Sequence, residues 1–341
     1  MEFGPRPLSD TLGAILAHSH QLPGRKLKKG HTLTADDLVA LAATGVQTLT
    51  VARPAPTDIG EDAAAAQLGL ALVPDPATAY LERSTATTGR VNLHATAPGI
   101  VQLDATAIHA LNRIDAAITF ATLAPFTRVT KGTLTGTVKI IAYAVDSTRL
   151  AQACDIARAA IRVLPVTRHS ASLLLTELPG QDATINAKLN TKAREVTARR
   201  LRALGMELAE VVITPHDSAA IAAALPHLTG EMILILTASA TSDLYDTGPE
   251  ALRAAGGAVA RFGMPVDPGN LLFTGTLGSR PVIGLPGCAR SPALNGADWV
   301  LERLACGLSV TGDDIAEMGV GGLLKEIPIR PHPREAHPPE G

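Results

Sequence analysis

Apolar residues in the second half of the chain fall into short β-like runs that alternate with longer segments of helical spacing. This pattern predicts strands over 172–176, 208–213 and 232–237, and helices over 183–204, 217–226, 248–255 and 292–306. Strands that alternate with helices of this length form βαβ units, so we expect a mostly parallel sheet with right-handed crossovers. Three later strands, 258–262, 271–276 and 281–285, follow one another too closely for crossover helices, and we expect a hairpin or an edge pairing there.

The first half of the chain has a more broken pattern. It predicts a strand over 47–52 and helices over 8–19, 34–45, 60–68 and 75–81. Thr34 is the expected N-cap of the second of these helices, because its hydroxyl can accept a hydrogen bond from a free backbone amide. Between residues 89 and 145, alternating Thr, Val and Ile predict short strands at 91–94, 100–103, 118–123, 128–129 and 133–144, with a helix over 105–111 and another over 147–160.

These changes of pattern divide the chain into four parts. We expect an N-terminal α/β segment over 1–88, a small β-rich domain over 89–146, an α/β domain over 147–327 and a proline-rich tail or linker over 328–341. The fold class is therefore α/β. At 341 residues, the chain is too long for one ordinary hydrophobic core.

Composition excludes several classes of function. A net charge of −2 and an aromatic content of 3% argue against a nucleic-acid surface, which needs a basic footprint or stacking platforms. The three cysteines have neither a disulfide pattern nor zinc-ligand spacing. The N-terminus lacks the apolar run of a signal peptide, and no segment has the apolar length of a membrane span. We therefore expect a cytoplasmic protein that binds neither nucleic acid nor membrane.

The segment after the strand at 232–237 is the first candidate site. In an open parallel sheet, ligands bind beyond the carboxyl ends of the strands. The segment offers hydroxyl groups and two carboxylates, and we single out Thr237, Ser239, Thr241, Ser242, Asp243 and Asp246. The carboxylates are suited to a magnesium ion that bridges to a phosphate. In the alternative interpretation, they are solvated residues that cap a helix, which begins at Thr247 with capping-box spacing to Glu250.

The segment from Gly284 to Ser291 is the second candidate. It also ends a strand, and Pro286-Gly287 forms a stiff turn whose amides can approach a ligand closely, unless the turn is purely structural. Ser291 is the expected N-cap of the following helix. Cys288 could be a reactive thiol or an inert one. Two lysines one helical turn apart, Lys188 and Lys192, could face the same crevice and meet a phosphate.

At this point the residues resemble a known family. Residues 172–306 are similar to the molybdopterin-binding domain shared by molybdopterin adenylyltransferases, molybdopterin molybdotransferases and gephyrin. Thr237–Asp246 resembles the family's Gly-Gly-x-Ser-x-Gly-x-x-Asp loop, residues 266–270 with Pro268 and Gly269 resemble its Lys-Pro-Gly-Lys turn, and Gly284–Ser291 resembles its Gly-Leu-Pro-Gly-Asn-Pro-x-Ser loop. Leu27–Val51 also resembles the segment that precedes this domain in molybdotransferases.

The resemblance implies a three-layer α/β domain that binds the pyranopterin dithiolene and its phosphate, with magnesium, in a homo-oligomer. It also implies a nucleotidyltransferase domain or partner beyond the proline-rich tail. The chain departs from the family pattern at several positions: Ala238, Ser239 and Asp243 replace glycines, Asp267 and Asn270 replace lysines, Cys288 replaces asparagine, Ala289 replaces proline and Thr176 replaces an aspartate.

Three functions follow from these observations. The first is a molybdenum cofactor biosynthesis protein in which Asp246, with Asp243, holds magnesium while molybdate enters the dithiolene. The second is a non-catalytic carrier or sensor that holds molybdopterin for a nucleotidyltransferase. The third is a nucleotide pyrophosphatase of the competence-damage type, which uses the same fold.

Overall fold

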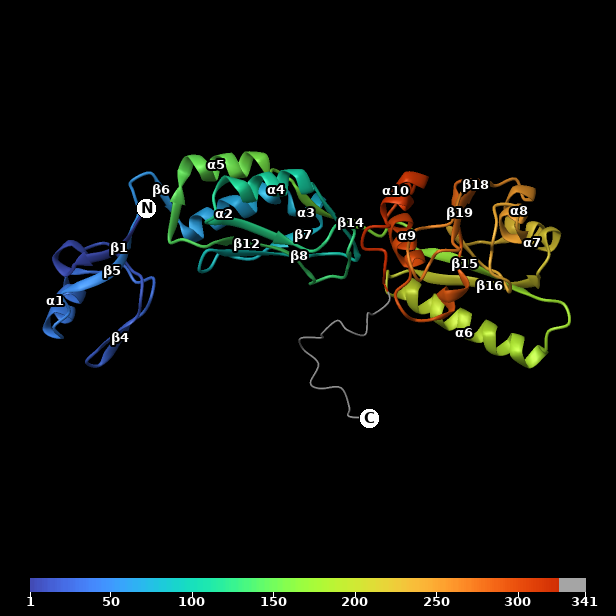
Figure 1. Cartoon of the computed structure of the whole chain (residues 1–341), viewed down its shortest axis with the longest axis horizontal. Helices are drawn as coiled ribbons and strands as arrows, with labels where there is room; N and C mark the ends of the chain where they lie inside the picture. The colour runs from blue at the N-terminus through green and yellow to red at the C-terminus, as the bar shows by residue number, and fades with distance from the viewer. Residues whose placement is uncertain (325–341) are drawn as a thin grey trace. The chain divides into compact units, whose positions relative to one another are not determined.

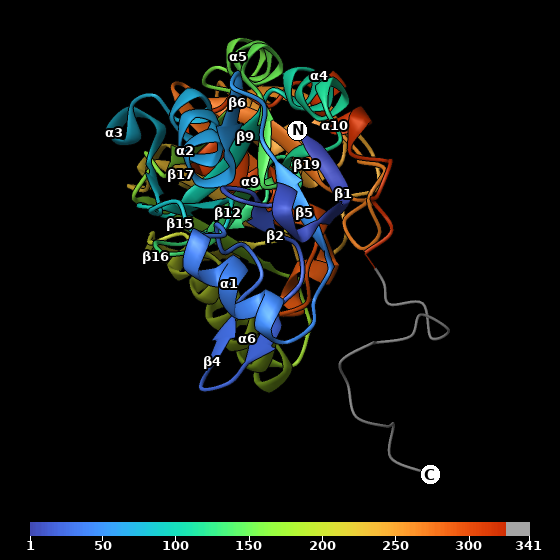
Figure 2. The ribbon, with the colours of Figure 1, turned by 90° about the vertical axis from the view of Figure 1, so that its left-hand side faces the viewer.

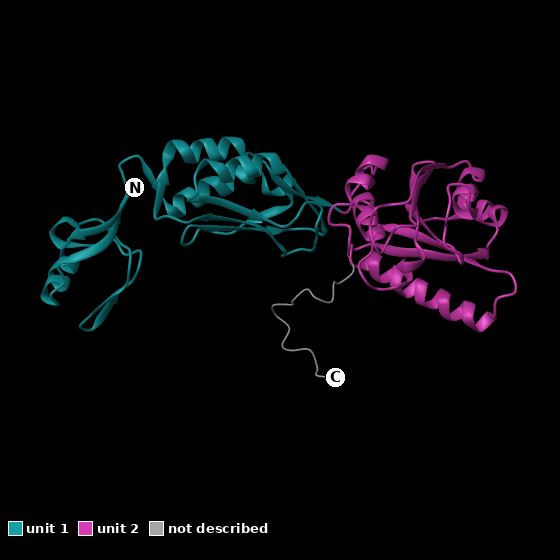
Figure 3. Ribbon diagram, viewed as in Figure 1, with its two compact units in different colours: residues 1–165 teal, residues 166–341 magenta. Residues whose placement is uncertain are grey.

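The computed structural model describes residues 1–324, so the proline-rich tail expected over 328–341 lies outside the described residues. The chain divides into two compact units, Met1–Pro165 and Val166–Gly341 (Figure 3). The four-part division expected from the sequence, with boundaries at 88/89 and 146/147, stays a prediction; one hydrophobic core takes residues from Ala64 through to Val163. The mixed α/β character expected of the chain is what the structure has.

The N-terminal part of unit 1 is a small α/β assembly with its own core. Three antiparallel strands lie in the order β1-β5-β2, and β3 and β4 form a hairpin. These strands span Glu2–Pro7 (β1), Ile15–Leu16 (β2), His20–Leu22 (β3), Arg25–Leu27 (β4) and Thr48–Arg53 (β5). The helix expected over 8–19 is wrong, since only Leu8–Asp10 makes a single 3₁₀ turn and Ile15–Leu16 pairs with β5. Ala14, Leu16, Leu41 and Val51 share one core here, so strand pairing overrides the local helical spacing.

Helix α1 (Ala35–Ala43) begins as the sequence predicts. Thr34 is its N-cap, and the Asp37 side chain closes a capping box by accepting the Thr34 backbone N–H. Asp37 is 1% exposed and also accepts hydrogen bonds from Arg25 Nη2 at 2.8 Å and from His31 Nε2 at 2.7 Å. One buried carboxylate therefore joins the helix to the hairpin strand β4.

The rest of unit 1 packs helices on antiparallel sheets. The strands are β6 (Asp58–Gly60), β7 (Leu81–Arg83), β8 (Arg90–Ala95), β9 (Gly99–Leu103), β10 (Ile118–Thr122), β11 (Arg128–Val129), β12 (Leu134–Ile140), β13 (Ala144–Asp146) and β14 (Ile161–Pro165). They form sheets in the orders β10-β12-β8-β7, β11-β9-β14 and β13-β6. The helices are α2 (Glu61–Leu72), α3 (Pro76–Ala79), α4 (Ala105–Ile114) and α5 (Ser147–Ile156). Helices α2, α4 and α5 lie on the same side of the β12–β8 sheet (Figures 1 and 2).

Unit 2 is built on one six-stranded sheet in the order β16-β15-β17-β20-β19-β18. The strands are β15 (Ser170–Glu177), β16 (Glu207–Pro215), β17 (Met232–Leu236), β18 (Ala258–Phe262), β19 (Phe273–Leu277) and β20 (Arg280–Gly284). The first four in the sheet order are parallel, whereas β19 and β18 join antiparallel. The expected hairpin among the late strands is confirmed.

Helices cover both faces of this sheet (Figure 1). They are α6 (Ala183–Arg202), α7 (Ser218–Ala224), α8 (Thr247–Ala254), α9 (Gly296–Ala305) and α10 (Gly312–Glu317). Alternate residues of β15 supply the two cores: Leu173 packs with α6, α9 and α10, whereas Leu174 packs with α7 and α8. Among residues 1–324, the structure contains no helix with both the length and the apolar character that a membrane crossing requires.

Candidate functional site

The carboxyl ends of the parallel strands bring the two candidate segments to one edge of the sheet. β17 and β20 are neighbours, with Ile235 opposite Gly284, so the segments that follow them start side by side. The chain leaves β17 toward α8 on one face and leaves β20 toward α9 on the other. Neighbouring strands whose connections diverge in this way leave a crevice where ligands of α/β sheets bind.

Hydrogen bonds tie the two segments together at their bases. Leu285 N donates to Ile235 O at 2.7 Å, and Arg290 Nη2 donates to Thr237 O at 3.1 Å. On the other side of β17, the buried Thr176 hydroxyl accepts a hydrogen bond from Ala238 N at 2.7 Å and lies 3.0 Å from His216 Nδ1. The ends of β15, β16, β17 and β20 thus form one connected network.

The segment after β17 is held by its own carboxylates. Asp246, not Thr247, is the N-cap of α8, since it accepts the Thr247 backbone N–H at 2.6 Å. The other Asp246 oxygen accepts Ser242 N at 2.8 Å and Ser242 Oγ at 3.2 Å. Burial alone would raise the pKa of Asp246, but the hydrogen bonds from Ser242 and Thr247 outweigh it and hold that pKa below its ordinary value.

The remaining residues of this segment differ in exposure. Thr237 and Thr241 are buried, and the Thr237 hydroxyl donates to Ser239 O at 2.6 Å. Ser239, Ser242 and Asp243 are exposed, and Asp243 Oδ1 accepts Tyr245 N at 2.8 Å.

Magnesium binding by Asp243 and Asp246 stays a prediction. Both oxygens of Asp246 and one oxygen of Asp243 already accept hydrogen bonds from the same segment. No cluster of three or more His, Cys, Asp or Glu side chains able to hold a metal occurs within residues 1–324. In this arrangement the pair does not fit a divalent cation, which takes several oxygen ligands.

The segment after β20 forms a 3₁₀ turn over Gly287–Arg290 before α9 begins. Ser291 ends this turn, and Asn295 is the N-cap of α9 with Asp298 completing a capping box, so the expected N-cap at Ser291 is wrong. Ser291 is followed by exposed residues, whereas Asn295 is 1% exposed and fully hydrogen-bonded to the helix start. Cys288 is exposed and its Sγ accepts from Asn295 Nδ2 at 3.0 Å.

The third motif, with Pro268 and Gly269, lies at the same edge of the sheet. β19 is antiparallel to β20 and starts with Phe273 opposite Gly284, so the turn before it is at the carboxyl ends of the parallel strands. Pro268 O accepts the Gly296 backbone N–H at 2.8 Å, which places the turn against the N-terminus of α9.

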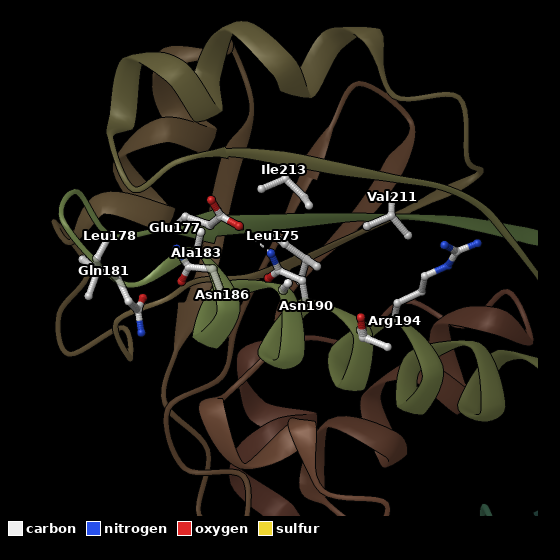
Figure 4. A pocket seen from close by; sticks show the side chains of 12 residues that line it. Leu175, Glu177, Leu178, Gln181, Ala183, Asn186, Asn190, Arg194, Val211 and Ile213 are labelled. Carbon is white, nitrogen blue, oxygen red and sulfur yellow. Dashed lines mark hydrogen bonds between the residues drawn. The ribbon is translucent and has the colours of Figure 1, made fainter.

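Lys188 and Lys192 lie apart from these segments. Both are exposed on α6, and neither has a hydrogen bond or an ion pair within residues 1–324. Asn186, Asn190 and Arg194, which also lie on α6, instead line a cavity of about 620 Å³ against β15 and β16 (Figure 4).

Two arginines that the sequence analysis did not single out complete the site. Arg200, on α6, donates through Nε to Asp298 Oδ1 at 2.6 Å and through its other nitrogens to the carbonyls of Ala289, Ser291 and Ala293. It fixes the path of the segment after β20. Arg290 is the last residue of the 3₁₀ turn and returns to Thr237 at the end of β17.

Arg290 is a partly buried cation without an acidic partner in the described part of the chain. Its Nε is buried without a hydrogen-bond partner, and within residues 1–324 it has no ion pair. Burial lowers the pKa of its guanidinium, which identifies a charge that water solvates poorly. Its Nη1 is the nearest atom to a Cβ built on Gly287, at 4.0 Å. The turn Pro286-Gly287 and the guanidinium therefore lie next to each other.

Comparisons with known proteins add a small amount to this description. Residues 5–53 match the model of a domain of unknown function, DUF8806. The search of curated proteins gave no match. Among solved structures, the chain is weakly similar to the molybdopterin biosynthesis MoeA protein from Pyrococcus horikosii, with a TM-score of 0.32 and 13% identity over 90% of this chain and 76% of that one. A likeness at this level does not bear on ligand or activity.

Proposed function

We propose that unit 2 binds a phosphorylated pterin of the molybdopterin type at the strand-end segments Thr237–Asp246 and Gly284–Ser291, as a carrier in molybdenum cofactor biosynthesis. The observation that carries the proposal is the partly buried Arg290 guanidinium. It joins the two segments through Thr237 O and has no acidic partner within residues 1–324.

A partly buried guanidinium without a counter-ion favours an anionic ligand. The charge loses hydration on burial, and one of its N–H groups is buried unpaired. Arginine binds phosphate with two parallel hydrogen bonds, and such charge-assisted bonds are about twice as strong as neutral ones. The Nη1 group beside Gly287 would meet the phosphate, and the adjacent backbone of a glycine allows close approach.

The choice of a pterin rests on the sequence motif. Gly284-Leu285-Pro286-Gly287 followed by Ser291 resembles the family loop most closely, and in the fold it occupies the end of a central parallel strand. The motifs at Thr237–Asp246 and at Pro268-Gly269 meet the same edge. Three family-like segments at one edge support a shared ligand, and the ligand of the family is a phosphorylated pterin.

Binding without turnover is favoured over molybdate insertion for two structural reasons. Asp246, which would hold the metal in an enzyme, caps α8 with both carboxylate oxygens engaged. Thr176, at the position of a family aspartate, is buried and hydrogen-bonded to Ala238 and His216. Neither group is available as the acid or the metal ligand that the insertion reaction needs, so we place the protein among carriers.

The test is a titration of the full chain with molybdopterin and with adenylylated molybdopterin under anaerobic conditions, with and without magnesium. We expect saturable binding of at least one form that does not require magnesium, and no release of nucleotide when molybdate is added. Arg290→Ala should weaken binding about 10- to 100-fold, as expected for a lost hydrogen bond to a charged group. The matched control is Arg202→Ala, an exposed arginine at the C-terminal end of α6.

The results of this titration distinguish the carrier from the molybdate-inserting enzyme and from the pyrophosphatase. Molybdate-dependent nucleotide release would overturn the carrier assignment in favour of the enzyme. Cleavage of ADP-ribose would favour the competence-damage type of pyrophosphatase. Equal affinity of the parent protein and of folded Arg290→Ala would remove Arg290 from the site.

A further inference from the structure

A cavity lies on the other side of β15, between α6 and the sheet. The cavity is lined on one side by the aliphatic side chains of Leu175, Val211 and Ile213 from β15 and β16. Its other side is lined by Asn186, Asn190, Thr191 and Arg194 from α6, and Glu177 and Gln181 close one end (Figure 4). At about 620 Å³ it has the size of small-molecule and cofactor sites.

Asn186 gives the first sign that a ligand belongs there. Its side chain is only 8% exposed, and its amide has no hydrogen-bond partner within residues 1–324. Because Asn186 lines the cavity, a ligand in the cavity can supply the missing donor and acceptor.

Glu177 and Asn190 supply the second sign. Asn190 Nδ2 donates to Glu177 Oε1 at 2.6 Å, so the two side chains are held toward each other (Figure 4). Glu177 Oε2 has no hydrogen bond within residues 1–324, and the Asn190 amide oxygen has none either. The pair therefore presents a fixed edge of acceptors to the cavity that Asn186 also lines.

This edge selects the chemistry of the ligand. A carboxylate accepts only, so it recognises neighbouring N–H groups, whereas an amide offers one donor and one acceptor. A ring that places an amino group beside a ring N–H, and a carbonyl beyond it, satisfies the carboxylate and the amides together. The 2-amino-4-oxo pyrimidine ring, which guanine and pterins share, has this edge. The aliphatic side chains of Leu175, Val211 and Ile213 can pack against the flat face of such a ring.

Arg194 extends the site toward an anionic group. It lines the cavity at the end away from Gln181 (Figure 4) and has no ion pair within residues 1–324. Asn186, Asn190 and Arg194 are four residues apart along α6, so they lie on one face, about 6 Å apart per step. A ring held by the two asparagines would place an attached phosphate near the guanidinium.

We propose that the cavity between α6 and β15–β16 is a binding site for a phosphorylated 2-amino-4-oxo pyrimidine heterocycle, read by Glu177, Asn186 and Asn190, with its phosphate on Arg194. The lining residues do not include any of the strand-end segments that we assign to molybdopterin. The proposal is therefore independent of Arg290 and can fail or hold by itself.

The test is a calorimetric titration of the full chain with guanosine 5′-monophosphate, adenosine 5′-monophosphate and neopterin monophosphate. We expect guanosine monophosphate or neopterin monophosphate to bind at least tenfold more tightly than adenosine monophosphate, which lacks the 2-amino group and the ring N–H. The comparison of the guanine and pterin arms identifies the source of the ring.

Two variants test the assignment of residues. Glu177→Gln should reduce the affinity for the preferred ligand at least tenfold and reduce its preference over adenosine monophosphate, with Glu195→Gln, an exposed glutamate on α6, as the matched control. Asn186→Leu should abolish binding without lowering the melting temperature, since the Asn186 amide makes no hydrogen bond within residues 1–324. Arg290→Ala should leave this binding unchanged.

The proposal is overturned if none of the three monophosphates gives saturable binding up to 5 millimolar. It is also overturned if adenosine monophosphate binds as tightly as the other two, or if both folded variants bind like the parent protein. Loss of binding in Arg290→Ala would instead place the ligand at the strand-end segments.

Discussion

Arg200 Nε lies 2.6 Å from Asp298 Oδ1, and both side chains are nearly buried. The pair links α6 to the capping box of α9, because Asp298 Oδ2 also accepts the backbone N–H of Asn295 at 2.9 Å. The same arginine donates to three carbonyls of the segment after β20. The Gly284–Ser291 segment is therefore held by a residue that lies some ninety positions earlier in the chain.

Replacing this arginine should destabilise unit 2. Arg200→Met leaves the Asp298 carboxylate without its cation and three carbonyls without donors, and breaking a buried pair in this way costs about 3–5 kcal/mol. Urea unfolding followed by the fluorescence of Trp299 measures this, because the single tryptophan of the chain lies in α9. The control is Arg199→Met, an exposed arginine on α6, which should change stability by less than about 0.5 kcal/mol. An unchanged midpoint for Arg200→Met would show that the pair is not essential.

The two glycines of the Gly-Leu-Pro-Gly motif should respond differently to alanine. A Cβ on Gly284 would lie 1.8 Å from Cε1 of the buried Phe273, whereas a Cβ on Gly287 would meet only Arg290 Nη1, at 4.0 Å. We expect Gly284→Ala to cost about 3 kcal/mol through overpacking. Gly287→Ala should keep the fold and weaken ligand binding, because its methyl group would occupy space beside the guanidinium where we place the phosphate. Thermal unfolding and the molybdopterin titration separate the two effects; equal melting temperatures for both variants would contradict this account.

Variants of Asp246 distinguish its role as the N-cap of α8 from a role as a metal ligand. Asparagine is as good an N-cap as aspartate, so Asp246→Asn should keep α8 and change ligand affinity by less than threefold, with or without magnesium. Asp246→Ala should lower the stability of unit 2 by about 1 kcal/mol, the usual cost of a lost cap. Both are measured by the Trp299 signal and by the pterin titration. Loss of a magnesium-dependent gain in affinity in Asp246→Asn would restore the metal assignment.

Local sequence predicts much of the fold, because many helix caps and apolar strand runs can be recognised from a few neighbouring residues. Thr34 caps α1 as expected, and the strands of the unit 2 sheet agree with their apolar runs to within a few residues. The cap of α8 was missed by one residue because Asp246 and Thr247 are adjacent and both can cap. The cap of α9 was placed at Ser291 because serine before proline is a strong local signal, yet burial of Asn295 decides the start.

The parts of the site that could not be predicted depend on tertiary contact. Arg290 follows a motif directly, but nothing local shows that its side chain turns back to β17. Asn186, Asn190 and Arg194 had a visible signal, since their spacing of four places them on one helical face. Spacing alone does not favour this face over the one with Lys188 and Lys192. The face that meets the cavity depends on where β15 and β16 lie.

Unit 1 should lose stability in acid through one carboxylate. Burial alone would raise the pKa of Asp37, but hydrogen bonds from Thr34 and His31 outweigh this and hold that pKa far below its ordinary value. A carboxyl group with a lowered folded-state pKa stabilises the fold above its unfolded value, about 3.9, and this contribution is lost as pH falls toward the folded value. We therefore expect the stability of unit 1 to be level near neutral pH and to fall below about pH 4.

The variant Asp37→Asn isolates the contribution of this carboxylate to the stability of unit 1. The asparagine can still complete the capping box with Thr34, but it cannot accept a charge-assisted bond from Arg25, so the stability of unit 1 should fall by about 1–2 kcal/mol at neutral pH. Its stability should also depend less on pH below 4 than that of the parent, because the group that titrates is gone. Amide hydrogen exchange of α1 and β5 between pH 3 and 7 measures both effects; Asp36→Asn, an exposed neighbour in the same turn, is the control. The same acid sensitivity in the parent and in Asp37→Asn would assign it to another group of unit 1.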